Sequence, residues 1–212
     1  DQVRALQILG FGSAGKILDN PYPLGGYTGI EVGLTSEFIP VEDLANLGDT
    51  TDASGEFTYY TLTFGKGLHY NVDIHVYFTP FIQKEKIQTY GGQLRWGFYE
   101  TSFFPLSFSA MVYAGGANFA NLINVTNWGA DLLATVTMDN VAVYAGMGRI
   151  WSVGQFIGGA DGVTDNQETV ERSYSDMHSV FGLNIDIDKF FVAMQVDRYV
   201  DSVYSGKVGF RF

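Results

Sequence analysis

The sequence predicts an all-β protein, an antiparallel transmembrane β-barrel of about ten strands, with eight strands as the alternative count. About ten segments alternate apolar and polar residues with a period of two, and each is near the ~10 residues that a tilted transmembrane strand requires. The mean hydropathy is only +0.05, which fits strands that pair an apolar face with a polar one. The connections between the segments include both tight turns and two long loops.

The first four predicted strands have a regular two-faced pattern. In residues 27–38, even-numbered apolar residues alternate with Glu31, Gly33 and Thr35, so the even positions are expected to face lipid. The outward positions expected in these strands are Ile30, Val32 and Leu34, then Tyr60, Leu62 and Phe64, then Val72, Ile74, Val76 and Phe78, and finally Tyr90, Leu94, Trp96 and Phe98.

The later strands repeat the pattern with one exception. Outward positions are expected at Leu106, Phe108, Ala110, Val112 and Ala114, at Trp128, Ala130, Leu132, Ala134 and Val136, at Phe181, Leu183 and Ile185, and at Val192, Met194 and Val196. The exception is the seventh segment, residues 141–153, because Arg149 shares the parity of the apolar Val143 and Met147. A bulge or a strand end is therefore expected near Gly148.

The last ten residues form the tenth predicted strand and carry a resemblance to a known family. Tyr204, Gly206, Val208, Phe210 and Phe212 lie on one face, and Lys207 and Arg211 lie on the other. This pattern resembles the C-terminal assembly signal of bacterial outer-membrane β-barrel proteins of the small porin-like class, which closes on an aromatic residue. The resemblance implies a bacterial outer-membrane location, an exported chain whose signal peptide is already removed, and contact with periplasmic and outer-membrane assembly machinery during insertion.

Connection lengths predict which end of the barrel is external. The connections at 39–56 and 154–173 are long, whereas Asp139-Asn140 and Asp188-Lys189 are tight turns. Outer-membrane barrels have short periplasmic turns and longer external loops. The two long loops are therefore expected outside, and an even strand number is expected to place both chain ends in the periplasm.

Composition excludes several other classes. The chain has 212 residues, no cysteine and a net charge of −11, which removes cysteine chemistry and disfavours nucleic acid as a partner. The charge-free stretch 101–130 contains Pro105 and a Gly115-Gly116 pair, so it does not fit a spanning helix. A soluble β-sandwich or lipocalin-like barrel would share the alternation but place its apolar face inside.

The N-terminal segment, residues 1–25, is expected to stand apart from the barrel of residues 26–212. Its Gly10 to Lys16 run nearly matches a phosphate-binding loop, but Pro21 and Pro23 break the helix that such a loop must open. Neither a nucleotide nor any other cofactor is therefore expected. The segment is predicted to be a periplasmic lead-in, a plug in the lumen, or an extra edge segment.

Charged residues on the inward face predict a polar network and not a catalytic or metal site. The expected lumen network comprises Glu31, Asp73, His75, Arg95, Asp131, Asp186, Lys207 and Arg211, since buried charges must pair. Asp176 and His178 lie two residues apart and resemble the Asp-x-His pair of omptin-like outer-membrane proteases, but the second acidic pair of that family has no clear counterpart. A lumenal hydrolase using these two residues is retained as an alternative.

Small outward residues predict a contact between protomers. They are Ala110, Ala114, Gly116, Ala130, Ala134 and Ala145, and small side chains permit close packing inside a bilayer. The leading hypothesis is a non-enzymatic, porin-like surface component that forms a homo-oligomer and binds or encloses lipid between protomers. Its expected partners are outer-membrane lipid and lipopolysaccharide, and a surface receptor acting through the two long loops is a further alternative.

Overall fold

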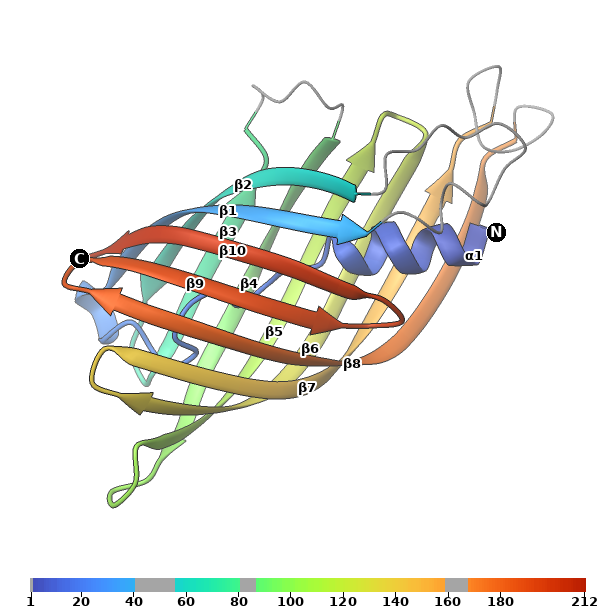
Figure 1. Ribbon diagram of the computed structural model, residues 1–212. Helices are drawn as coiled ribbons and strands as arrows, with labels where there is room; N and C mark the ends of the chain where they lie inside the picture. Colours follow the sequence, from blue (N-terminus) through green and yellow to red (C-terminus); the bar gives the residue numbers. More distant parts are fainter. Residues whose placement is uncertain (1, 41–55, 81–86, 159–167) are drawn as a thin grey trace.

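The chain folds into a closed antiparallel barrel of ten strands (Figure 1). The computed structural model describes residues 2–40, 56–80, 87–158 and 168–212. The strands are β1 (Ile30–Pro40), β2 (Glu56–Gly67), β3 (Val72–Phe78), β4 (Ile87–Glu100), β5 (Leu106–Phe119), β6 (Ile123–Met138), β7 (Val141–Phe156), β8 (Val170–Ile187), β9 (Phe190–Arg198) and β10 (Ser202–Arg211). Each strand pairs with the next and β10 pairs with β1, which confirms ten strands and excludes eight.

The two faces of the wall follow the predicted alternation. Outward Leu34, Ile74 and Phe181 are 44%, 43% and 56% exposed, whereas the inward neighbours Thr35 and His75 are each 2% exposed. A wall with its large apolar side chains outside and its charged side chains inside is suited to lipid and not to water. The structure therefore excludes the soluble lipocalin-like alternative.

The seventh strand is regular, so the irregularity expected near Gly148 is wrong. Strand β7 keeps an unbroken register with both β6 and β8 through Arg149. The Arg149 side chain points outward, lies 5.3 Å above the Trp151 ring and donates a hydrogen bond to Ser175. A long cationic side chain on a lipid-facing wall reaches toward the interface in this way, so parity alone did not require a bulge. The register shift lies instead in β4, between Gly97 and Tyr99.

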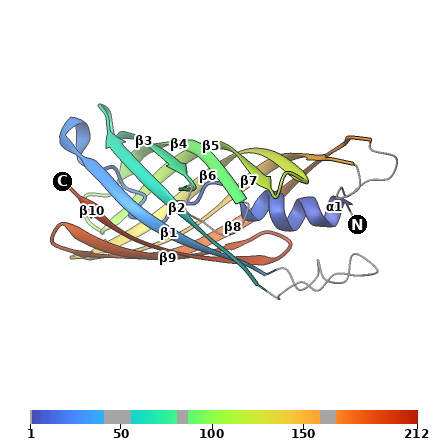
Figure 2. The same cartoon turned by 90° about the horizontal axis from the view of Figure 1, so that it is seen from above.

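The two ends of the barrel differ, and the N-terminal segment begins at the end opposite to the C-terminus. We call the end that holds Phe212 the turn end, and the other end, where β1 finishes and β2 begins, the loop end. Helix α1 (Gln2–Ala5) and the π-helical η1 (Leu6–Gly10) lie at the loop end (Figures 1 and 2). The described N-terminal residues and the C-terminus thus lie at opposite ends of the barrel, so the expectation that both chain ends lie on the same side of the membrane is wrong.

An ion pair fixes the N-terminal helix to the loop end. The Arg4 guanidinium lies 3.1 Å from the carboxylate of Asp201, between β9 and β10. After η1 the chain runs through the barrel to the turn end, where the 3-10 helix η2 (Gly26–Thr28) precedes β1. No helix among the described ranges is long and apolar enough to cross a membrane.

Glycine positions in the wall make room for inward aromatic rings. Gly182 of β8 faces Tyr144 of β7 in direct register, and a Cβ atom at Gly182 would meet the Tyr144 ring. We expect Gly182→Ala to lower the free energy of unfolding by about 1–3 kcal/mol, the usual cost of overpacking. Urea unfolding in lipid vesicles, followed by tryptophan fluorescence, measures this cost.

The matched control is Gly206→Ala on β10. Its added Cβ would have its nearest neighbour, a backbone oxygen, 3.9 Å away, so its free energy of unfolding is expected to change by less than about 0.5 kcal/mol. If Gly182→Ala and Gly206→Ala changed the free energy of unfolding equally, the explanation by crowding at Tyr144 would be wrong.

Candidate functional site in the barrel lumen

The N-terminal segment fills the lumen that the strands enclose. Leu6, Phe11 and Ile17 are at most 1% exposed, and the Phe11 ring packs 5.7 Å and 5.6 Å from the rings of Tyr174 and Tyr199. Sequence periodicity describes strand faces, so it could not place this segment. The segment is buried inside the barrel, which is the position expected of a plug. The division of the chain into two parts at residue 25 stays a prediction.

Lumenal amide side chains hold the backbone of this segment. Asn127 Nδ2 donates to the carbonyl oxygen of Gly10 at 3.2 Å, and the Leu18 N–H donates to Gln195 Oε1 at 3.0 Å. These bonds satisfy backbone groups that would otherwise be buried without partners. The wall and the segment are therefore matched by polar contacts as well as by packing.

The first buried charge cluster centres on Arg95 of β4. Its guanidinium binds both carboxylate oxygens of Asp19, with Nη2 2.9 Å from Oδ2, and it also contacts Nε2 of His75. Asp73 Oδ2 is 4.0 Å from Arg95 and accepts the N–H of Leu24 at 3.0 Å. Two paired hydrogen bonds between a guanidinium and a carboxylate give strength and a fixed orientation, so Asp19 attaches the segment to the wall.

Glu31 of β1 joins this cluster to the turn end. Its carboxylate accepts from Lys207 Nζ at 2.5 Å and from Arg211 Nε at 2.9 Å, and Arg211 also binds Asp186 at 2.7 Å. His75 Nδ1 lies 3.9 Å from Glu31. The structure thus brings together seven of the eight residues expected in the lumen network, and Asp131 belongs to a different cluster.

The Asp19, Glu31 and His75 side chains could each offer one metal ligand, with ligand atoms within 4.8 Å of one another. The same carboxylates already bind the Arg95 guanidinium and the Lys207 ammonium group. A divalent cation placed there would be repelled by both cations. The charges present fit an ion-pair network better than a metal centre.

The second cluster surrounds Lys16 of the N-terminal segment. Lys16 Nζ lies 3.7 Å from Glu37 and donates to the carbonyl oxygens of Gly12 and Ala14 at 3.0 Å each. The Tyr59 hydroxyl donates to Glu37 at 2.8 Å. The lysine of the near-match to a phosphate-binding loop is therefore directed at a carboxylate and at its own backbone.

His178 lies in the same half of the lumen but apart from Asp176. His178 Nε2 is 2.8 Å from Asp131 and 3.3 Å from the Tyr113 hydroxyl, and its ring stacks on Tyr199 at 4.8 Å. Asp176 instead accepts the backbone N–H of Met177. The two residues of the Asp-x-His motif therefore have separate partners, and His178 is only 5% exposed.

Sequence reasoning missed Lys16, Asp19 and Glu37 as members of these clusters. Glu37 has the same parity as Glu31 on β1, so the alternation contained the signal for it. Asp19 and Lys16 belong to a segment without strand periodicity, and only the folded chain brings Asp19 to Arg95, which is 76 residues away in sequence.

The segment leaves the lumen at the turn end through further contacts. The Tyr22 hydroxyl donates to Glu100 at 2.7 Å, and this hydrogen bond raises the pKa of the Tyr22 phenol. A Cβ atom at Gly97 would meet Pro23, so the wall and the segment lie in close contact there.

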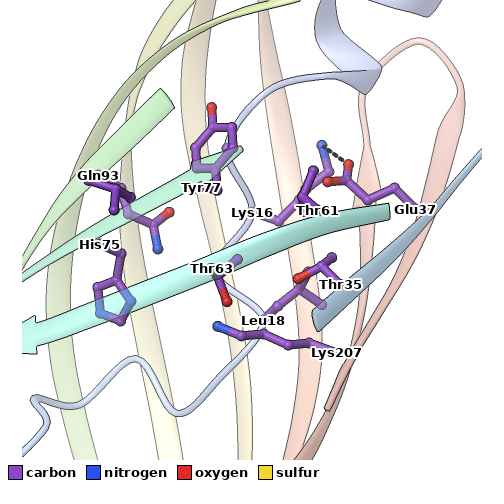
Figure 3. Close-up of a pocket in the computed structure, with 12 residues that line it drawn as sticks. Lys16, Leu18, Thr35, Glu37, Thr61, Thr63, His75, Tyr77, Gln93 and Lys207 are labelled. Atoms are coloured by element: carbon purple, nitrogen blue, oxygen red, sulfur yellow. Dashed lines mark ion pairs between the residues drawn. The ribbon is translucent and has the colours of Figure 1, made fainter. Parts of the chain in front are cut away.

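What remains of the lumen near Lys16 is a cavity of about 20 Å³. Figure 3 shows Lys16 and Glu37 joined by their ion pair, with Tyr77, Gln93, His75 and Lys207 around the same cavity. A single water molecule needs roughly 10–15 Å³ of such space. The cavity holds about one water and does not suit an organic substrate.

The fold and the filled lumen define a class: an antiparallel transmembrane β-barrel with the exterior of outer-membrane barrels, and with its own N-terminal segment inside. No protein-family model matches the chain, and no curated protein matches it. Among solved structures, Ail of Yersinia pestis, crystallised with the heparin analogue sucrose octasulfate, is 15% identical over 87% of this chain and 97% of its own, with a TM-score of 0.35.

Two further solved structures have similar values. The N-terminal β-barrel domain of Pseudomonas aeruginosa OprF is 12% identical over 88% of this chain and 99% of that one, with a TM-score of 0.38. Neisserial surface protein A is 8% identical over 86% of this chain and 94% of its own, with a TM-score of 0.32. The strand order of this chain, and not these similarities, establishes its barrel fold.

Proposed function

We propose that this protein is a non-enzymatic, porin-like barrel of the bacterial outer membrane that acts as an integral surface component through its outer wall and loop end. The carrying observation is the filled lumen: Leu6 and Asp19 are fully buried, and the cavity beside Lys16 measures about 20 Å³. A solute would have to displace the N-terminal segment and its ion pairs. The barrel therefore has porin-like strands and a lumen that does not conduct in this conformation.

The outer wall supports the membrane placement. Two bands of exposed aromatic side chains mark the two interfaces, as in outer-membrane barrels. The band toward the loop end comprises Phe38, Tyr60, Tyr90, Trp128 and Tyr204, and the band toward the turn end comprises Trp96, Phe98, Phe210 and Phe212. The assembly-signal residues Tyr204, Gly206, Val208 and Phe210 lie on the outward face of β10, and the exposed Phe212 directly follows that strand. The role of these five residues in insertion stays a prediction.

Conductance measurement tests the proposed closed lumen. The intact protein, inserted into planar bilayers, is expected to give no stable stepwise openings at moderate voltage. Correct folding is checked by heat-dependent electrophoretic migration of the same sample. Long-lived openings of folded intact protein would contradict the proposal.

The hydrolase alternative has less support. His178 is paired with Asp131, is covered by Tyr199 and is separated from Asp176, and a catalytic pair must be accessible to its substrate. Peptide or lipid hydrolysis by purified barrel that disappears in His178→Ala would restore this alternative. The receptor alternative depends on loop residues that lie largely outside the described ranges.

The outer wall also supports the proposed homo-oligomer. Ala114 and Ala130 line a groove of about 470 Å³ between the larger Val76, Leu94 and Trp128. Ala110, Ala134 and Ala145 continue this small-residue face over β5, β6 and β7, whereas Gly116 is covered by the Tyr90 side chain. Close approach of a second wall is favourable at such small residues, and lipid retained between protomers is part of the proposal.

We expect Ala114→Trp to shift the protein from oligomer to monomer, because the indole fills the groove that the partner wall would enter. Crosslinking in native membranes, followed by gel analysis, measures the shift. Leu34→Trp on β1 is the matched control, since Leu34 is also outward and 44% exposed. An unchanged oligomer size in Ala114→Trp would contradict this interface.

A further inference from the structure

Two outward arginines occur together near the loop end of the membrane-facing wall. Arg149 of β7 pairs with Met177 of β8, and Ser179 of β8 pairs with Arg198 of β9. Met177 and Ser179 are consecutive outward positions of β8, so the two arginines flank this strand. Two strand spacings separate β7 from β9, and the partners of the two arginines are two residues apart along β8, which places the arginine backbones roughly 12 Å apart.

The position of this pair corresponds to the outer interface. Trp151 is the next outward position after Arg149 toward the loop end, and its ring stacks on Trp128 at 4.0 Å. Paired tryptophans at this height are typical of the boundary between lipid tails and headgroups. Arg149 and Arg198 are both exposed there, at the depth of lipid headgroups.

The arginines retain donors for an anion. Arg149 uses one nitrogen toward Ser175 Oγ, at 3.2 Å, and a guanidinium has five N–H donors. Within the described part of the chain, neither arginine forms an ion pair with a carboxylate. Two nearby acids are engaged elsewhere, since Asp201 binds Arg4 and Asp176 accepts the N–H of Met177.

An apolar groove of about 420 Å³ begins directly below Arg198, on the strands next to the β7 strand that carries Arg149. It lies on the outward face of β8, β9 and β10, with Phe38 of β1 at its edge, and its other lining residues include Phe181, Leu183, Met194, Val196, Tyr204 and Gly206. Val196 is the next outward position after Arg198, and Phe181 is the next after Ser179. Gly206 lacks a side chain between Met194 and Tyr204, which deepens the groove. Along β9, the cationic Arg198 is thus followed by the apolar groove.

We propose that Arg149 and Arg198 bind the phosphate of a phosphorylated glycolipid of the outer leaflet, with one of its acyl chains in the groove of β8 to β10. Guanidinium groups form strong, oriented hydrogen bonds with phosphate. The chain as a whole carries a net charge of −11, so an anionic headgroup needs a local cationic site to approach it. The inference rests on the proposed outer-membrane placement, and it is independent of whether the lumen conducts.

Native mass spectrometry with defined lipid A, which carries two phosphates, tests the site. The double variant Arg149→Gln/Arg198→Gln is expected to bind lipid A at least about tenfold more weakly than the intact protein, because it loses charge-assisted hydrogen bonds. The control variant Lys66→Gln/Lys189→Gln removes two cations near the turn end and is expected to stay within about twofold. Equal binding of lipid A by the arginine variant and the intact protein would overturn the proposal.

Two further ligands and one further variant distinguish the contribution of the phosphate headgroup from that of the acyl chain. Dephosphorylated lipid A is expected to bind the intact protein as weakly as lipid A binds the arginine double variant. Inorganic phosphate at millimolar concentration is expected not to compete with lipid A for the intact protein, because phosphate lacks the acyl chain. Gly206→Trp is expected to weaken lipid A binding by filling the groove. If the intact protein bound dephosphorylated lipid A as tightly as lipid A, the assignment of the arginines to the phosphate would be overturned. If the intact protein formed a lipid-free dimer that Gly206→Trp dissociates, the assignment of the groove to an acyl chain would be overturned. Failure of the protein to fractionate with outer membranes would overturn the proposed function, whereas correct fractionation without arginine-dependent binding would overturn this site alone.

Discussion

Asp19→Asn is expected to lower the free energy of unfolding by about 3–5 kcal/mol, the usual cost of removing one partner from a buried ion pair. Asp19 and Arg95 have side chains that are 0% and 1% exposed, and the guanidinium spans both carboxylate oxygens. Asparagine keeps the size of Asp19 but cannot neutralise the arginine. Arg95 would then remain charged and buried, with only the more distant Asp73 and Glu31 to compensate.

Urea unfolding in lipid vesicles measures this loss, and two variants control it. Asp139→Asn makes the same chemical change in the exposed turn between β6 and β7, where residue 139 has φ = 52°; asparagine tolerates that conformation, so little change is expected. Adding Arg95→Gln to Asp19→Asn is expected to recover part of the stability, since the unpaired charge is gone. A loss below about 1 kcal/mol in Asp19→Asn would show that the pair does not hold the segment in the lumen.

Deletion of residues 2–25 is expected to convert the closed barrel into a conducting one. The deletion removes the side chains that fill the lumen, including Leu6, Phe11 and Ile17. The remaining inward acids, Glu31, Glu37, Asp73, Asp131, Asp186 and Asp197, outnumber the inward bases Arg95, Lys207 and Arg211. The open state is therefore expected to prefer cations over anions, and the reversal potential in a salt gradient across a planar bilayer measures this preference.

A peptide added in trans provides the control for the deletion. A synthetic peptide of residues 2–25 is expected to block the currents, whereas the same peptide with Asp19→Lys is expected to block poorly, because lysine would face Arg95. Circular dichroism and heat-dependent migration establish that the deleted barrel is folded. A folded deletion variant without conductance would mean that wall side chains close the lumen by themselves, and anion preference would contradict the lumen charges.

The strands were predictable because each is specified by its own residues. In β3, Asp73 and His75 point inward and Ile74 and Val76 point outward, as a period of two requires. The same local rule predicted the outward faces and most of the lumen network, and it favoured ten strands over eight. It was wrong at Arg149, where the flexible stem of arginine let a cation occupy an outward position without disturbing the register.

Tertiary structure decided everything that depends on residues far apart in sequence. The pairing of His178 with Asp131 in place of Asp176, and of Lys16 with Glu37, follows from strand register and from the path of the N-terminal segment. Alternation reports which face of a strand a side chain occupies, but not which strand lies opposite across a closed lumen.

The sequence by itself determined a barrel of about ten strands, with eight as the alternative count, that has an apolar exterior and a charged interior, since strand periodicity is a local property of the chain. Only the tertiary structure decided that the interior is filled by the N-terminal segment, and that Arg149 and Arg198 flank β8 beside one groove. These features depend on barrel closure and shear, which bring distant residues to the same height.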